Sequence, residues 1–116
     1  MALPLVPLAL ERDGEIIAGV IYQPISDELF WAEKGKGCFV NDHRLRVAAR
    51  QRLHESVLAT GIPFRARNRF EEYIRSLKAI SFGSAGMRRG GSAALDLAYV
   101  ACGRFDGFWE INLSAW

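Results

Sequence analysis

Short apolar runs alternate with turn residues over the first half of the chain. The runs at residues 5–10 and 16–22 are joined through Asp13-Gly14, a dipeptide typical of tight β-hairpins. Further apolar runs follow turn residues at 29–32, 38–40 and 45–47. This pattern predicts an antiparallel strand meander over residues 1–52. Because the first two runs are apolar at most positions, we expect both faces of those two strands to be covered.

The period of the apolar positions changes in the second half. A short apolar run at residues 57–60 predicts a buried strand. Farther along, four large apolar side chains recur at helical spacing, with charged residues between them: Phe70, Tyr73, Ile74 and Leu77. Asn68 and Glu71 form a capping-box pair in front of this stripe. We therefore expect an amphipathic helix that Asn68 opens and that lies on the outside of a sheet.

The most apolar helix signal lies between Ser92 and Gly103. The Ser92 hydroxyl can accept a hydrogen bond from an amide of the first turn, and Gly103 supplies the left-handed residue that ends a helix. Between these two signals, one face consists of Ala94, Leu97, Ala98 and Ala101. Most of the helix surface is apolar, so we expect this helix to be buried.

A strand follows this helix. In residues 108–111 the side chains of a strand alternate between two faces, so Glu110 shares a face with Phe108. Taken together, the pattern predicts an α/β (α+β) fold. The meander of residues 1–52 is followed by a β-α-β-α-β portion over residues 53–116.

The entrance of the last helix is the first place that could carry chemistry. Gly90-Gly91 precede it, and its first residues, Ser92 and Ala93, have small side chains. Helix N-termini present free amides and a partial positive charge, so a phosphate or a polyhydroxylated ligand could reach the backbone here. The alternative is that the glycines only permit a tight strand-to-helix turn. The short glycine motif leaves both interpretations open.

Glu110 is the second candidate. Its carboxylate is flanked by aromatic residues and needs a partner. That partner could be an arginine in a structural ion pair, with Arg88 and Arg89 as nearby candidates. It could instead be a ligand whose hydroxyls donate hydrogen bonds at the start of the preceding helix.

The composition narrows the class of protein. The 116 residues, 50% hydrophobic and 24% charged, suit one globular domain of modest size. A net charge of +2 is too small to indicate a nucleic-acid partner, and no apolar run is long enough to span a membrane. Cys38 and Cys102 lack the C-x-x-C spacing, and we expect reduced thiols in a cytoplasmic protein, with a disulfide as the alternative.

The stretch GSAALDLAYVACGRFDGFWE, followed shortly by a Trp, resembles the C-terminal signature region of the inositol monophosphatase family. These are magnesium-dependent phosphomonoesterases that include the bacterial extragenic-suppressor proteins. LALERDGEIIAGVIYQPISDELFWAEKGKGCFVNDHRLRV resembles the family's central antiparallel strands, and LATGIPF resembles the strand that opens its C-terminal half. The resemblance covers nearly all of the chain. It implies part of the layered αβαβα sandwich of the sugar-phosphatase superfamily.

The resemblance also implies a substrate-binding site. In the family, the Gly and the Ala of the G-[ST]-A segment line the substrate pocket with backbone groups. The Glu of the following strand accepts hydrogen bonds from substrate hydroxyls. In this sequence those positions are Gly91, Ala93 and Glu110.

The sequence departs from the family at its metal ligands. Family members hold their metals with a G-E-x-E segment, a D-P-[LI]-D-G-T loop and the Asp of a W-D pair, none of which is present. We therefore expect Mg²⁺ to belong to the complete enzyme. For this chain we expect no metal ligands, no catalytic residues and no turnover. Both chain ends fall in apolar segments, which favours a piece of a larger fold.

Our first hypothesis is that the chain is part of a Mg²⁺-dependent phosphomonoesterase that hydrolyses inositol monophosphate or a related polyol or sugar phosphate. The alternative from another class is a non-catalytic binding or oligomerisation module of the same fold. A nucleotide- or fructose-bisphosphatase specificity also stays open. Because an apolar meander with unpaired edges favours association of two copies, we expect a homodimer.

Overall fold

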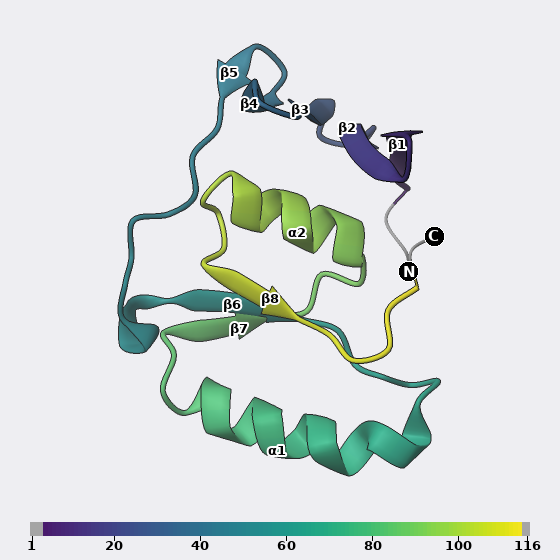
Figure 1. Ribbon diagram of the computed structural model, residues 1–116. Helices are drawn as coiled ribbons and strands as arrows, with labels where there is room; N and C mark the ends of the chain where they lie inside the picture. The colour runs from purple at the N-terminus through teal and green to yellow at the C-terminus, as the bar shows by residue number, and fades with distance from the viewer. Residues whose placement is uncertain (1–3, 115–116) are drawn as a thin grey trace.

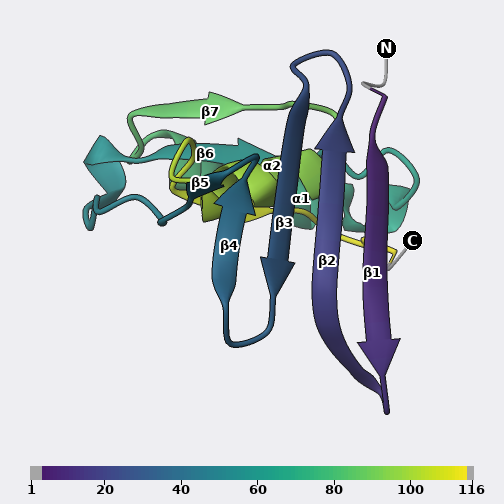
Figure 2. The same ribbon diagram turned by 90° about the horizontal axis from the view of Figure 1, so that it is seen from above.

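A five-stranded antiparallel sheet forms the first layer of the molecule (Figures 1 and 2). The computed structural model describes residues 4–114. The strands lie side by side in chain order, and each pairs with the next: β1 (Val6–Arg12), β2 (Glu15–Gln23), β3 (Glu28–Glu33), β4 (Gly37–Val40) and β5 (His43–Arg44). The predicted meander is confirmed, because tight turns join successive strands directly.

The second half of the chain forms a three-stranded parallel sheet with the order β7-β6-β8. Its strands are β6 (Val57–Thr60), β7 (Gly86–Arg88) and β8 (Gly107–Trp109), connected through α1 (Phe70–Ser81) and α2 (Ala93–Ala101). Two 3₁₀ turns, Leu53–Glu55 and Arg67–Arg69, precede β6 and α1. Figure 1 shows α2 between the two sheets and α1 on the outer side of the small sheet. The α/β class and the β-α-β-α-β order agree with the sequence prediction.

The core that joins α2 to the large sheet is small. Its buried members are Phe30 of β3 and Leu95 and Ala98 of α2. Six partly buried apolar residues pack around them: Leu5, Ile21, Val40, Leu45, Tyr99 and Cys102. Burial of this apolar surface holds the helix against the sheet.

Arg104 reinforces the contact between the end of α2 and the large sheet. Its guanidinium donates two hydrogen bonds to the carboxylate of Glu28, one of them at 2.9 Å. It also lies 4.8 Å from the ring centroid of Tyr99 and 5.6 Å from that of Phe30. A bidentate ion pair that also stacks on two rings is a geometry that arginine provides and lysine does not.

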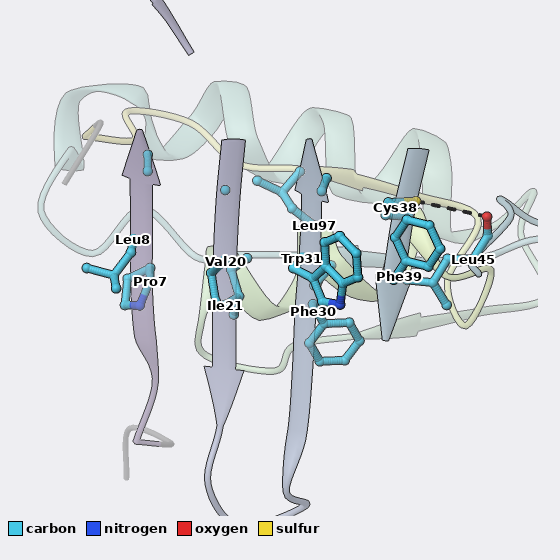
Figure 3. Close-up of a pocket in the computed structure, with 15 residues that line it drawn as sticks. Pro7, Leu8, Val20, Ile21, Phe30, Trp31, Cys38, Phe39, Leu45 and Leu97 are labelled. Atoms are coloured by element: carbon cyan, nitrogen blue, oxygen red, sulfur yellow. Dashed lines mark hydrogen bonds between the residues drawn. The ribbon is translucent and has the colours of Figure 1, made fainter. Parts of the chain in front are cut away.

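The predicted ends of α2 are confirmed. The Ser92 hydroxyl accepts a hydrogen bond from the Leu95 amide at 3.5 Å, and Gly103 has a φ of +76° just past the helix. The predicted burial of α2 is correct for Leu95 and Ala98 but wrong for Leu97, which is 52% exposed. Leu97 lies at an open apolar groove between α2 and the large sheet (Figure 3).

That groove has a volume of about 670 Å³ and owes its depth to small side chains. Ala9, Gly19, Ala32 and Cys38 are paired in register across four strands and all line it. Because none of the four fills the space in front of α2, the sheet and the helix do not close on each other there.

Three further expectations from the sequence were wrong in detail. β1 is exposed along its whole length, because it is an edge strand and α2 packs on Phe30 of β3 instead. Asn68 does not cap α1, which begins at Phe70 with no side-chain cap. Asn68 lies inside the 3₁₀ turn, and Arg69 instead binds Glu72 through two hydrogen bonds of 2.9 and 3.0 Å. The fifth strand consists of His43–Arg44, not residues 45–47.

Neither of the two α-helices described is long and apolar enough to cross a membrane. Cys38 and Cys102 are free thiols, so the disulfide alternative is not observed.

Candidate functional site

A small pocket of about 60 Å³ lies where the small sheet meets the start of α2. The carboxyl ends of β6 and β8 lie on the same side of the molecule as the N-terminus of α2 (Figure 1). Thr60 and Trp109 are paired in register at those ends, so the residues that follow them, Gly61 and Glu110, enter the pocket together. Ligands of parallel α/β sheets bind at this edge as a rule.

The entrance of α2 forms one wall of the pocket. Gly91 has a φ of +87°, a conformation that favours glycine, and it turns the chain into the helix. Ser92 and Ala93 follow as the N-cap and the first helical residue, and all three line the pocket. The unpaired amides of a first helical turn donate hydrogen bonds and attract negative or electronegative groups.

Glu110 lines the same pocket. The structure thus brings Gly91, Ala93 and Glu110 to the lining of one pocket. Their roles in binding stay predictions. No arginine or lysine lies within ion-pair distance of Glu110 in the part of the chain that the structure describes, so the structural ion pair considered from the sequence is not observed. Burial raises the pKa of Glu110, and the positive charge of Arg89 partly opposes this rise.

Asp96 is a second carboxylate at this pocket, and it is not among the site residues predicted from the sequence. It is only 3% exposed. Burial, and secondarily the negative charge of Glu110, raise the pKa of Asp96 from its ordinary value of 3.8 to about 6, while Arg89 acts in the opposite direction. One signal could have found this residue: it is the sole charged side chain among the nine residues of α2.

Two glycines accommodate the two carboxylates. A Cβ atom on Gly61 would overlap the carboxyl group of Glu110, and one on Gly90 would lie 2.6 Å from Oδ1 of Asp96. Neither glycine has a positive φ. A side chain at either position would therefore force the nearby carboxylate to move, whereas the backbone conformation would not oppose it.

The side chains of this pocket do not fit a magnesium ion. Mg²⁺ takes six ligands in near-octahedral geometry, mostly carboxylate oxygens, phosphate oxygens and water. The pocket offers two carboxylates and the guanidinium of Arg89, whose positive charge repels a cation. Within residues 4–114, no group of three or more His, Cys, Asp or Glu side chains could hold a metal ion.

Comparison with known proteins identifies the family. The profile of the inositol monophosphatase family matches residues 6–116. Inositol-1-monophosphatase of Caulobacter vibrioides is 54% identical over 113 residues, which cover 96% of this chain and 44% of that protein. Nus factor SuhB of Escherichia coli is 44% identical over 111 residues, covering 96% of this chain and 42% of the relative.

A solved structure agrees with these sequence matches. Extragenic suppressor protein suhB from Bartonella henselae superposes with a TM-score of 0.92 at 54% identity, over 97% of this chain and 43% of that one. The chain thus spans about two fifths of the length of the relatives it matches. On the match of the family profile and on these similarities, the chain belongs to the inositol monophosphatase family.

Proposed function

We propose that the pocket at the start of α2 holds the alcohol portion of a phosphate monoester, inositol monophosphate or a related polyol or sugar phosphate. The chain is then the substrate-holding part of a phosphomonoesterase. The observation that carries this proposal is that hydrogen-bond donors and an acceptor line one small pocket. The amides of Gly91 and Ala93 can donate to hydroxyl oxygens, and the Glu110 carboxylate can accept from hydroxyl hydrogens.

The charge of the pocket favours the alcohol over the phosphate group. Two carboxylates, Asp96 and Glu110, share the pocket with the single guanidinium of Arg89. A phosphate group in the same small space would face like charges, whereas hydroxyls would satisfy both carboxylates. The name inositol-1-monophosphatase of the Caulobacter relative agrees with a polyol phosphate as the substrate class.

Mg²⁺ would be bound by segments of the complete enzyme other than residues 4–114, where it would activate water and neutralise the phosphoryl oxygens. The residues of this chain would orient the alcohol and keep it in place. Two free thiols suit a reducing compartment, so we place the protein in the cytoplasm.

Titration of the ¹⁵N-labelled chain with myo-inositol tests the proposal. We expect saturable shifts of the Gly91 and Ala93 amide signals. For Glu110→Gln we expect a dissociation constant at least ten times larger. This loss corresponds to one charged hydrogen-bond acceptor, about 1.5–3 kcal/mol. The control is Glu71→Gln, an exposed position on α1 that should bind as the unmodified chain does. If Glu110→Gln bound myo-inositol with the same dissociation constant as the unmodified chain, the proposal would be refuted.

The second candidate is a non-catalytic binding module of the same fold. It is favoured by the exposure of the apolar strand β1, whose Leu8 is 67% exposed, and by the name Nus factor SuhB of the Escherichia coli relative. An exposed apolar edge strand favours pairing with another chain, and a homodimer is the simplest product. Light scattering of the purified chain distinguishes the candidates, because a strictly monomeric chain would remove the motive for this one.

A further inference from the structure

Asp96 is a nearly buried carboxylate that lines the pocket. It is the fourth residue of α2, and only 3% of its surface is exposed. Among residues 4–114, no side chain or backbone amide donates a hydrogen bond to its carboxylate, and no cationic group lies within 4 Å. Buried carboxylates in folded proteins are normally paired. The unpaired acceptors of Asp96 line the same small pocket as Glu110.

The pocket is shaped around both carboxylates. Gly90 leaves room for Asp96 and Gly61 leaves room for Glu110, although neither glycine needs its backbone freedom. The positive charge of Arg89 partly opposes the rise in the pKa of both carboxylates. The pocket holds one positive and two negative groups. The carboxylate oxygens can therefore accept more hydrogen bonds than the described residues donate.

The volume of the pocket limits what can satisfy these acceptors. About 60 Å³ corresponds to roughly two water molecules, or two hydroxyl groups on adjacent carbons of a larger molecule. A phosphate group would place its negative charge beside two carboxylates. Two neighbouring hydroxyls fit the volume, the charge and the two acceptors together.

We propose that Asp96 is a second ligand-binding carboxylate, which accepts a hydrogen bond from one hydroxyl while Glu110 accepts from its neighbour. The pocket thereby selects compounds with two hydroxyls on adjacent carbons over compounds with one. This inference rests on the proposed function, since it assigns a further contact to the same alcohol site.

A pair of matched probes tests this selectivity. The ¹⁵N-labelled chain is titrated with cis-1,2-cyclohexanediol and with cyclohexanol, and the Gly91 and Ala93 amides report binding. We expect the diol to bind at least tenfold tighter than the mono-alcohol. In Asp96→Asn this ratio should fall at least threefold, because the neutral amide oxygen is a weaker acceptor than a carboxylate. Asp42→Asn, in an exposed turn, should keep the ratio of the unmodified chain.

The outcomes separate this inference from the proposed function. A tenfold preference that persists in folded Asp96→Asn would overturn the role of Asp96 and leave the proposed function standing. Equal affinities of the unmodified chain for diol and mono-alcohol would overturn it as well. No saturable shift with myo-inositol or either probe would overturn both proposals. The dispersion of the amide signals reports folding, and Asp96→Ser serves as a second variant, with the same loss of preference expected.

Discussion

The Asp96 carboxylate is buried where its neutral form is favoured, so it makes the fold less stable at neutral pH. Its pKa rises from 3.8 to about 6 on folding. Between these values the folded chain binds more protons at this group than the unfolded chain does. The contribution of Asp96 to the free energy of unfolding therefore falls as the pH rises from about 4 to about 6. The loss is complete above that range and amounts to about 3 kcal/mol as an upper bound.

We therefore expect Asp96→Asn to raise the free energy of unfolding at pH 7 by about 1–3 kcal/mol. The gain over the unmodified chain should shrink below pH 5, where Asp96 is protonated. Urea denaturation at pH 4.5, 5.5 and 7 measures this difference, with Asp42→Asn as the control. If Asp96→Asn were instead less stable at pH 7, Asp96 would be a structural residue.

The same residues show which parts of the site a sequence can reveal. Gly91 and Ser92 are predictable because their roles lie in local backbone geometry and in a hydrogen bond three residues away. The roles of Asp96, Gly61 and Gly90 cannot be predicted in this way, because they depend on which carboxylate packs against which glycine in the folded chain. Such a contact joins segments that are far apart in the sequence or on different elements.

At the scale of elements, the end of α2 depends on how closely another segment approaches it. Gly103 and Gly14 have similar φ angles, +76° and +78°. An added Cβ at Gly103 would lie 3.1 Å from both the Arg46 carbonyl oxygen and the Ala48 amide nitrogen, whereas at Gly14 nothing lies within 4 Å. The segment that links the two sheets therefore passes directly over Gly103.

We expect Gly14→Ala to lower the free energy of unfolding by about 1 kcal/mol, the cost of a side chain at positive φ. Gly103→Ala should cost about 2–4 kcal/mol, because the linking segment must also move. Guanidinium denaturation of both variants compares them directly. If both variants lost the same free energy of unfolding, the segment that contains Arg46 and Ala48 would move without an energetic penalty.

The sequence predicted elements best where the signals for their ends were local. Both ends of α2 follow from Ser92 and Gly103. The start of α1 does not follow from Asn68, because a 3₁₀ turn and the fork between Arg69 and Glu72 decide it. Coverage of the strand faces is a property of the packed layers, and no local pattern in β1 reports it.

At the scale of the whole molecule, the distribution of carboxylates sets the limit on chemistry. Hydrolysis of a phosphate monoester by this family depends on metal ions, and the described residues contain no group of three possible metal ligands. We expect the chain, incubated with inositol 1-phosphate and Mg²⁺, to release no phosphate above background. The Caulobacter relative serves as the positive control in the same assay. Magnesium-dependent release by this chain would show that its acidic residues had been misinterpreted.

The order of the layers could be predicted because the chain resembles a family over nearly its whole length. The relative position of α2 and the large sheet could not, since it depends on Phe30 meeting Leu95 and Ala98 across the sequence. The open groove beside this contact could not be predicted from the pattern of apolar residues either. Small and large apolar side chains count alike in such a pattern.

The two sheets differ in how well they tolerate larger side chains. The large sheet has open space in front of a row of small residues: Ala9, Gly19, Ala32 and Cys38. Ala59, at the centre of the small sheet, is 0% exposed, and an added methylene group there must displace its neighbours. Ala32 borders open space, so a leucine there finds room and gains apolar contacts. Substitutions that enlarge an alanine are thus penalised in one sheet and accepted in the other.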